Sequence, residues 1–228
     1  MVLRMKLPRK SPRVTPRERR RIAEIFDRFA AATPEPRTEL AYASPFMLLV
    51  AVVLSAQATD KGVNAATPRL FAIADTPAKM VGLGEAALIP LIASIGLFRT
   101  KARNVVALSR ILEEKYGGEV PLNREALQSL PGVGRKTASV VLNELGAEAA
   151  IAVDTHVFRV AHRLGLSKGK TPDQVEADLT RVVPKDRLSR AHHWLILHGR
   201  YVCVARKPRC AECLVADLCP SRELFLGA

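Results

Sequence analysis

The sequence predicts an all-α fold with about ten to twelve helices joined by short connections. Apolar residues recur at helical spacing in nearly every long segment, for example in residues 22–29 and 157–164. Residue types that start helices precede such segments, and glycines that end helices follow them. Long segments do not alternate apolar and polar residues as half-buried strands do, so we expect no sheet.

Individual helices have recognisable start or stop residues. Ser44 caps a helix whose first residue is Pro45, and Asn123 caps a short helix that ends near Leu130. A hairpin separates this short helix from the next one. In chain order, the expected helical segments are 22–29, a helix from Pro45, helices ending before Gly96 and Gly117, Asn123–Leu130, Arg135–Leu145, a helix from Thr155 that ends before Gly165, and an apolar helix with His192, His193 and His198.

Positive charge is concentrated at the start of the chain. The 228 residues carry a formal net charge of +13, and residues 1–21 contribute +8 of it, with nine Lys or Arg and one Glu. Because prolines and like charges cannot bury enough surface to fold, we expect residues 1–15 to form a flexible basic arm. The uneven charge indicates a polyanionic partner, and an aromatic content of only 5% favours a duplex over single strands. A solubilising tail is the alternative.

Membrane association is not expected. The longest apolar run, residues 46–54, is far shorter than the roughly 20 residues that span a bilayer, and the charged N-terminus is unlike a signal peptide. We expect a monomeric, soluble protein of the cytoplasm, at the nucleoid if the source is bacterial.

Two glycines and a proline form a tight hairpin at residues 131–134, and the next helix opens with Arg135 instead of a capping acid. Gly132 and Gly134 leave room for backbone amides to approach a phosphate, which would also neutralise Arg135. A P-loop and a dinucleotide fingerprint are excluded, because Arg135 precedes the lysine, a helix precedes the hairpin, and the third glycine is missing. A plain turn between packed helices is the alternative.

Lys136 follows in the first turn of that helix. The helix dipole and the neighbouring Arg135 both disfavour an ammonium group there, so we expect the pKa of Lys136 to be lowered. A lysine of this kind is a nucleophile that forms Schiff bases, including one with the masked aldehyde of a sugar that loses its base. The alternative is a point charge that binds phosphate.

Asp154 is the candidate partner of Lys136. The helix after the hairpin carries the chain about 18 Å away, and residues 146–154 can span about 26 Å when extended, so the chain can return. Asp154 would cap the helix that starts at Thr155 and stay ionised. Such a carboxylate suits the stabilisation of a cationic sugar or the acceptance of a proton from an amine. A purely structural N-cap is the alternative.

All four cysteines lie near the C-terminus, in a C-x6-C-x2-C-x5-C run. Their clustering indicates a metal centre more than disulfides, and an iron–sulfur cluster is favoured over zinc, which usually takes two close pairs. Basic residues between the first two cysteines could balance the anionic site and face phosphate. We expect the three histidines of the preceding helix to be packed or hydrogen-bonded and not to be ligands. The four cysteines are Cys203, Cys210, Cys213 and Cys219, and the basic residues are Arg206, Lys207 and Arg209.

Over residues 16–222 the sequence resembles the endonuclease III family of DNA repair glycosylases with an associated abasic-site lyase. The resemblance is carried by LSAQATD at 54–60, LPGVGRKTA at 130–138, AVDTHVFR at 152–159, HHWLILHGRYVC at 192–203 and the cysteine spacing. It implies a six-helix barrel domain at 38–148 with a helix-hairpin-helix, an iron–sulfur domain formed by 16–37 and 149–228, and an active-site cleft between them.

The resemblance also implies the reaction and the site residues. Lys136 is expected as the Schiff-base nucleophile, Asp154 as the catalytic carboxylate, and the four cysteines as ligands of a 4Fe–4S cluster. The enzyme would remove oxidised pyrimidines from duplex DNA by base flipping and nick the strand by β-elimination. Residues expected to contact DNA, with Gln57 filling the vacated space and Leu97 wedging the opposite strand, are Gln57, Leu97, Gly132, Val133, Gly134, Arg135, His156, Arg206 and Lys207. A loop at 98–100 is expected beside the opposite strand.

Two other classes of protein share some of these sequence features. Adenine mismatch glycosylases share the hairpin, the aspartate and the cluster, but they usually lack the lysine and add a C-terminal domain, whereas only nine residues follow Cys219 here. A noncatalytic DNA-binding module that senses redox state would also need the basic surface and the cysteines. Only catalysis needs a reactive amine beside a carboxylate.

Overall fold

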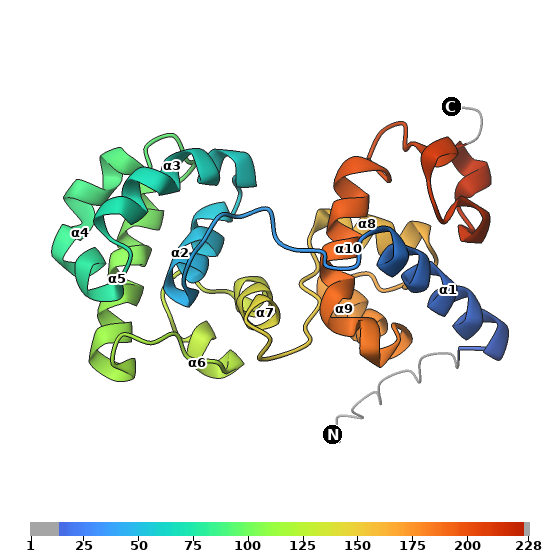
Figure 1. The fold of residues 1–228 in the computed structure, drawn as a ribbon, viewed down its shortest axis with the longest axis horizontal. Coiled ribbons are helices and arrows are strands. Elements are labelled where there is room, and N and C mark those ends of the chain that lie inside the picture. The colour runs from blue at the N-terminus through green and yellow to red at the C-terminus, as the bar shows by residue number, and fades with distance from the viewer. Residues whose placement is uncertain (1–13, 226–228) are drawn as a thin grey trace, which may run out of the picture.

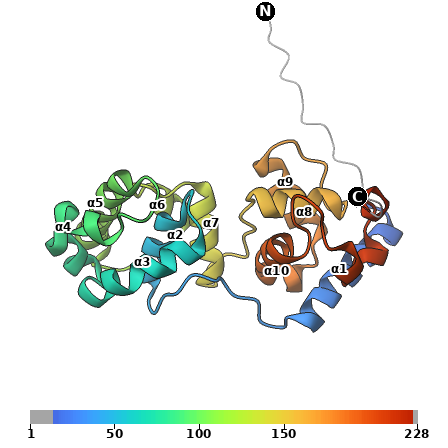
Figure 2. The same ribbon diagram turned by 90° about the horizontal axis from the view of Figure 1, so that it is seen from above.

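The computed structural model describes residues 14–225, and within this range it contains ten α-helices, four short 3₁₀ helices and no strand. The all-α prediction is confirmed. The helices form two lobes that lie side by side and are joined by two extended segments, residues 33–44 and 145–154 (Figures 1 and 2). None of the helices in the described range is long and apolar enough to cross a membrane.

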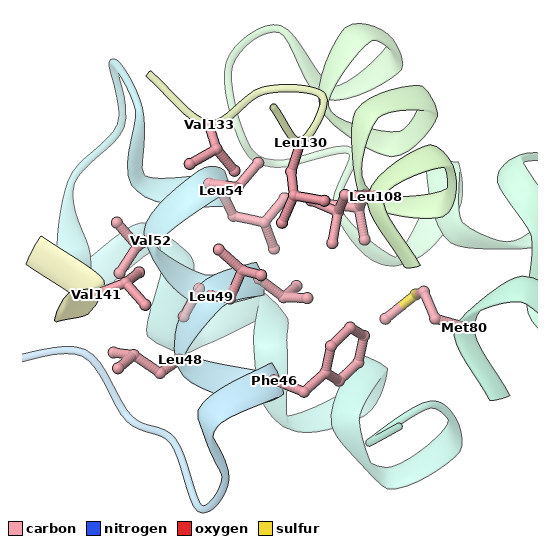
Figure 3. Close-up of a cluster of buried hydrophobic side chains, with 14 of the residues drawn as sticks. Phe46, Leu48, Leu49, Val52, Leu54, Met80, Leu108, Leu130, Val133 and Val141 are labelled. Atoms are coloured by element: carbon pink, nitrogen blue, oxygen red, sulfur yellow. The ribbon is translucent and has the colours of Figure 1, made fainter. Parts of the chain in front are cut away.

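Six helices build the first lobe around one apolar core. Its central helix is α2, in which eight of the nine positions from 46 to 54 are buried, Met47 being the exception, so this helix is apolar on every side (Figure 3). Gly84, at φ 71°, kinks α4, and Gly117 ends α5 in the left-handed conformation. The helices are α2 (Pro45–Ser55), α3 (Asp60–Ile73), α4 (Pro77–Leu91), α5 (Phe98–Tyr116), α6 (Arg124–Gln128) and α7 (Arg135–Glu144).

The second lobe combines the first helix with the last part of the chain. Its separate apolar core joins residues 22–29 of the first helix to residues between 151 and 215, so the first lobe is inserted between two parts of the second. Trp194 lies in this core and donates its indole N–H to the carbonyl of Thr33. The elements are α1 (Pro16–Ala32), α8 (Thr155–Arg163), α9 (Pro172–Val182), α10 (Leu188–Tyr201) and the 3₁₀ helices η1 (Lys185–Arg187), η2 (Cys210–Glu212), η3 (Ala216–Leu218) and η4 (Arg222–Phe225).

Most helices start with a side-chain cap. Threonine, serine, asparagine or aspartate accepts a hydrogen bond from the first turn of α1, α2, α3, α4, α6, α8 and α9. By contrast, α5 starts after Leu97 and α7 starts after Gly134, and neither residue forms a side-chain cap. The amides at the start of α7 therefore keep their capacity to bind an anion.

Two details differ from the sequence-based expectation. Val14 packs against the second core and Thr15 caps α1, so the folded part includes the last two residues of the predicted arm, whereas residues 1–13 lie outside the described range. Residues 98–100 are not a loop, because α5 begins at Phe98. Leu97, which precedes this helix, adopts the left-handed conformation.

Candidate active site

A cavity of about 750 Å³ opens between the two lobes. It is lined by Lys136 from the start of α7 and by Asp154 at the end of the segment that returns to the second lobe. The structure thus brings together the lysine and the aspartate that the sequence selected. Other residues of the lining include Glu39, Gln57, Asp60, His156, Lys170, His192, His193 and Arg200.

Lys136 is exposed, and it lies in the first turn of a helix without a side-chain cap. The preceding Gly134 is extended, and its carbonyl accepts the N–H of Ala138, so the helix is regular from its first residue. A lysine at this position projects from a rigid element into the cavity and not from a loop. Its amine can therefore be held at a fixed place relative to a bound molecule.

Asp154 is the N-cap of α8. Its Oδ1 accepts hydrogen bonds from the N–H of His156 at 2.9 Å and of Val157 at 2.8 Å, while its Oδ2 lies 3.2 Å from Nδ1 of His156. Burial alone would raise the pKa of Asp154, but the hydrogen bond from Val157, the charge of Lys136 and the contact with His156 lower it below its ordinary value. The carboxylate is thus ionised and close enough to Lys136 for their charges to interact.

The hairpin between α6 and α7 has the backbone that its glycines predict. Gly132 has a φ of 80°, which a side chain disfavours, and both Gly132 and Gly134 are exposed. The side chain of Val133 is buried in the first core, and its N–H donates to the carbonyl of Leu130 at 3.1 Å. The hairpin therefore offers its two glycines to a partner, and Val133 anchors it.

Replacing Gly132 with alanine is expected to destabilise the first lobe by about 1–3 kcal/mol. An added Cβ would lie 3.0 Å from Nδ2 and 3.1 Å from Cβ of Asn104, in a left-handed backbone. Gly134→Ala is the matched control, because Gly134 has a φ of −85° and its added Cβ meets nothing within 4 Å. Denaturant unfolding of both variants checks the prediction, and equal stabilities would contradict it.

Arg135 is neutralised within the protein. Its guanidinium lies 2.9 Å from Oε2 of Glu176 and 3.5 Å from Oδ1 of Asp173, and both acids belong to α9. The sequence suggested a bound phosphate as a partner of this charge, and the structure adds two partners within the protein. The partner lies 41 residues further along the chain, where no local pattern reveals it.

Gln57 and Leu97 share an unusual backbone. Both are exposed non-glycine residues in the left-handed region, with φ values of 55° and 58°. Their turns are neighbours, because a Cβ added to Gly96 would lie 3.8 Å from the carbonyl oxygen of Gln57. Gln57 lines the cavity, while the side chain of Leu97 is 60% exposed beside it. Strained, exposed residues of this kind concentrate at functional sites.

A buried polar cluster connects the two lobes, and its member His193 lines the cavity. Glu144, at the end of α7, lies 3.0 Å from Nε2 of His193 on α10, and it accepts the hydroxyl of Tyr42 at 2.8 Å. Burial would raise the pKa of Glu144, but the hydrogen bonds from His193 and Tyr42 lower it. Burial and the bond to Glu144 raise the pKa of Tyr42 to about 12. An ionised Glu144 requires that His193 donates this hydrogen bond.

A second polar connection lies at the mouth of the cavity. Arg200 on α10 pairs with Glu39 in the extended segment and with Asp60 at the start of α3, the latter at 2.6 Å. The hydroxyl of Tyr201 donates to the same Glu39. These contacts could not be predicted from the sequence, because the two residues of each pair lie more than a hundred positions apart in the chain.

The four cysteines line one pocket beside α8 and α10, and none of them forms a disulfide. Among the described residues, no group of three or more histidine, cysteine, aspartate or glutamate side chains could hold a single metal ion. A donor set of four thiols spread around one pocket suits a cluster and not one zinc ion. Burial, together with the neighbouring thiols, raises the pKa of Cys213 and Cys219, and a bound metal centre would favour their thiolate forms.

Arginines hold the cysteine segment in place. Arg163 on α8 donates to the carbonyl of Val204 at 2.7 Å and lies 3.5 Å from the sulfur of Cys203. Arg28 on α1 pairs with Asp217, and Arg21 donates to the carbonyl of Leu218. The sequence alone did not indicate that arginines contact the cysteine segment. The only local signal was that Arg159 and Arg163 recur at helical spacing on the polar side of α8. Arg206 and Lys207 are exposed between the first two cysteines.

The histidines of α10 are buried, as the sequence predicts. Burial lowers the pKa of His198 to about 4 and that of His192 to about 3, so both rings are neutral near pH 7. Nε2 of His198 lies 3.7 Å from the sulfur of Cys213, so this ring contacts the cysteine segment.

Together, a helix-hairpin-helix, a cleft between two helical lobes and a terminal cysteine segment define a DNA base excision repair protein. Residues 50–185 match the family described as HhH-GPD superfamily base excision DNA repair protein, and residues 203–219 match the iron–sulfur binding domain of endonuclease III. The chain belongs to the endonuclease III family.

Curated relatives and solved structures agree with this assignment. The endonuclease III of Haemophilus influenzae is 55% identical over 200 residues, which cover 88% of this chain and 95% of the relative, and that of Escherichia coli K12 is 53% identical with the same coverage. The structure of a trapped endonuclease III–DNA covalent intermediate has a TM-score of 0.84 at 44% identity, covering 90% of this chain and 97% of that one. This protein is a DNA glycosylase with abasic-site lyase activity, and it carries a 4Fe–4S cluster.

Proposed function

We propose that the protein removes oxidised pyrimidines from duplex DNA, with Lys136 as the nucleophile and Asp154 as its catalytic carboxylate. The observation that carries this proposal is that both residues line one cavity from different lobes, with the charge of Lys136 close enough to lower the pKa of Asp154. The cavity of about 750 Å³ has room for a flipped nucleotide.

The reaction follows from these two groups. The neutral amine of Lys136 attacks the anomeric carbon, the glycosidic bond breaks, and its electron pair leaves with the base, which takes up a proton. Asp154 stabilises the developing positive charge of the sugar and accepts a proton from the amine. The sugar ring then opens: the nitrogen lone pair forms the C1′=N bond as the C1′–O4′ bond breaks, and O4′ takes up a proton. The resulting protonated imine acidifies the adjacent C2′–H. Loss of that proton expels the 3′ phosphate with the electron pair of its C–O bond, and water then releases Lys136.

DNA is held by the elements around the cavity. The exposed glycines of the hairpin and the uncapped start of α7 suit a backbone phosphate. Arg206 and Lys207 extend this basic surface, while Arg135 and His156 contribute after rearranging their contacts with Glu176 and Asp154. Gln57 and Leu97, side by side with positive φ, occupy the space that a flipped base leaves and separate the opposite strand.

The remaining assignments concern the cluster and the organisation of the chain. Cys203, Cys210, Cys213 and Cys219 would hold the 4Fe–4S cluster, which shapes the basic segment between the first two ligands. The two separate cores support a division into a barrel domain at 38–148 and a cluster domain formed by 16–37 and 149–228. We propose that the protein acts as a monomer on cytoplasmic DNA, at the nucleoid if the source is bacterial.

The test is borohydride trapping of the purified protein on three duplexes that contain one thymine glycol, one 8-oxoguanine or no lesion. Borohydride reduces an imine between enzyme and sugar to a stable adduct. We expect an adduct with the thymine glycol duplex alone. An adduct only with the oxidised purine would overturn the substrate class, and base release without any adduct would overturn the lysine mechanism.

Cys213→Ser is expected to remove the cluster and to loosen the segment from 203 to 219. The thiolate is a far better iron ligand than a serine hydroxyl, and metal binding contributes directly to the folding of such a segment. The brown colour and visible absorption of the purified protein should be lost, and limited proteolysis should cut this segment. A variant that keeps the native iron content and absorption would contradict the assignment of Cys213 as a ligand.

A further inference from the structure

Helix α7, which carries Lys136, is attached to the opposite lobe at both of its ends. Its first residue, Arg135, contacts α9, and its last residue, Glu144, contacts α10. The helix itself belongs to the first lobe, where Ala138, Val141 and Leu142 enter the core. Lys136 is the immediate neighbour of one of these attachments.

The attachment at the end of α7 is buried. The side chains of Glu144 and His193 are each only 8% exposed and lie 3.0 Å apart, and Tyr42 binds the same carboxylate. A buried carboxylate that loses such partners is strongly disfavoured, so the pair resists separation of the lobes.

The attachment at the start of α7 is more exposed to solvent, but one of its two main side chains is largely buried. Arg135 is 54% exposed, whereas Glu176 is 15% exposed and holds the guanidinium through contacts of 2.9 and 3.0 Å to the same oxygen. Asp173, which is 72% exposed, adds a longer contact at 3.5 Å. Glu176 is therefore the principal partner of Arg135.

These contacts matter because the two apolar cores are separate clusters. Lys136 moves with the first core, while Asp154 caps α8 of the second. The distance between the amine and the carboxylate thus depends on how the lobes are held together, and α7 is held there by directional polar contacts.

We propose that Glu144 and Glu176 are positioning residues that clamp α7 to the second lobe and hold Lys136 at reacting distance from Asp154. This inference rests on the proposed function of Lys136. A displacement of about 1 Å between reacting groups costs about a hundredfold in rate, so loss of a clamp contact slows the chemical step and leaves DNA affinity nearly unchanged.

The experiment measures the single-turnover rate of adduct formation on the thymine glycol duplex, together with the Kd for that DNA. It compares the native holoenzyme with Glu144→Ala, Glu144→Gln, Glu176→Ala and the double alanine variant. Asp178→Ala is the matched control, because Asp178 lies on the same helix as Glu176 but its partners, Arg181 and Ser167, both belong to the second lobe. Far-UV circular dichroism and cluster absorption verify folding.

The clamp predicts a rate about tenfold lower for each alanine variant and lower still for the double variant, with Kd changed less than about threefold. Glu144→Gln should recover most of the rate, because an amide still bonds to His193 and Tyr42. If Glu144→Ala does not fold, Glu176→Ala and Glu144→Gln carry the test.

Native rates in the folded alanine variants would overturn the clamp. Tighter DNA binding by Glu176→Ala at a native rate would also overturn it, since Glu176 would then only compete with phosphate for Arg135. Lys136→Ala separates the two hypotheses: an adduct with this variant refutes the lysine assignment, whereas its absence beside native rates in the clamp variants refutes the clamp alone.

Discussion

Replacing Lys136 with alanine should reduce adduct formation and strand nicking by at least about a thousandfold, because the variant loses the only atom that forms the imine. Stability should change little, since the side chain is exposed and alanine suits a helix. Borohydride trapping and gel analysis of a DNA duplex with one abasic site measure the loss. The abasic substrate isolates the lyase step from base removal.

Lys170→Ala provides the control for this result. Lys170 is also exposed and lines the same cavity, but it does not belong to α7. We expect it to form the adduct at a native rate. If Lys136→Ala retained the adduct while Lys170→Ala lost it, the nucleophile would be Lys170, and the mechanism would have to start from the second lobe.

Two substitutions of Asp154 should separate its structural role from its chemical role. Asparagine caps helices as well as aspartate does, whereas alanine loses the cap at a cost of about 1 kcal/mol. Asp154→Asn should therefore keep nearly native stability but lose about 10²- to 10⁴-fold in activity, because the amide has no negative charge and accepts no proton. Asp154→Ala should lose both. Thermal unfolding and single-turnover base release measure the two effects, and an active Asp154→Asn variant would reduce Asp154 to a structural cap.

The same carboxylate predicts a dependence of stability on pH. The pKa of Asp154 in the folded protein lies below its ordinary value of 3.8, so the ionised form stabilises the fold above that pH. This contribution is lost as the pH falls through the folded pKa. The stability of the native protein relative to Asp154→Asn should accordingly decline as the pH falls below about 4, and the decline should end once Asp154 is protonated in the folded protein.

Local patterns were sufficient for the helices, the hairpin and the cap. Ser44 and Asn123 cap the helices that the sequence assigns to them, because a cap involves only the next three residues. Asp154 caps α8 for the same reason. The proximity of Lys136 and Asp154 could also be anticipated, since the length of the connecting segment limits where the chain can return.

Contacts between distant segments could not be anticipated. Arg135 contacts Glu176 on α9, and Glu144 contacts His193, which lies 49 positions further along the chain. No local sequence pattern links the two members of either pair. Local patterns also hid the burial of Val133, because two flanking glycines indicate exposure while the residue between them turns inward. These differences arise from tertiary packing, which single-sequence periodicity does not encode.

The insertion of the first lobe into the second has a consequence for biosynthesis. As the ribosome releases the chain, helix α1 emerges first, but the residues that cover it, such as Trp194 and Val215, emerge last. The first lobe can fold meanwhile, since its core is complete by residue 142. The nascent protein therefore passes through a stage in which the hairpin is folded while the apolar side of α1 is exposed to solvent. The active site is complete only when α1 packs against the C-terminal helices of the second lobe.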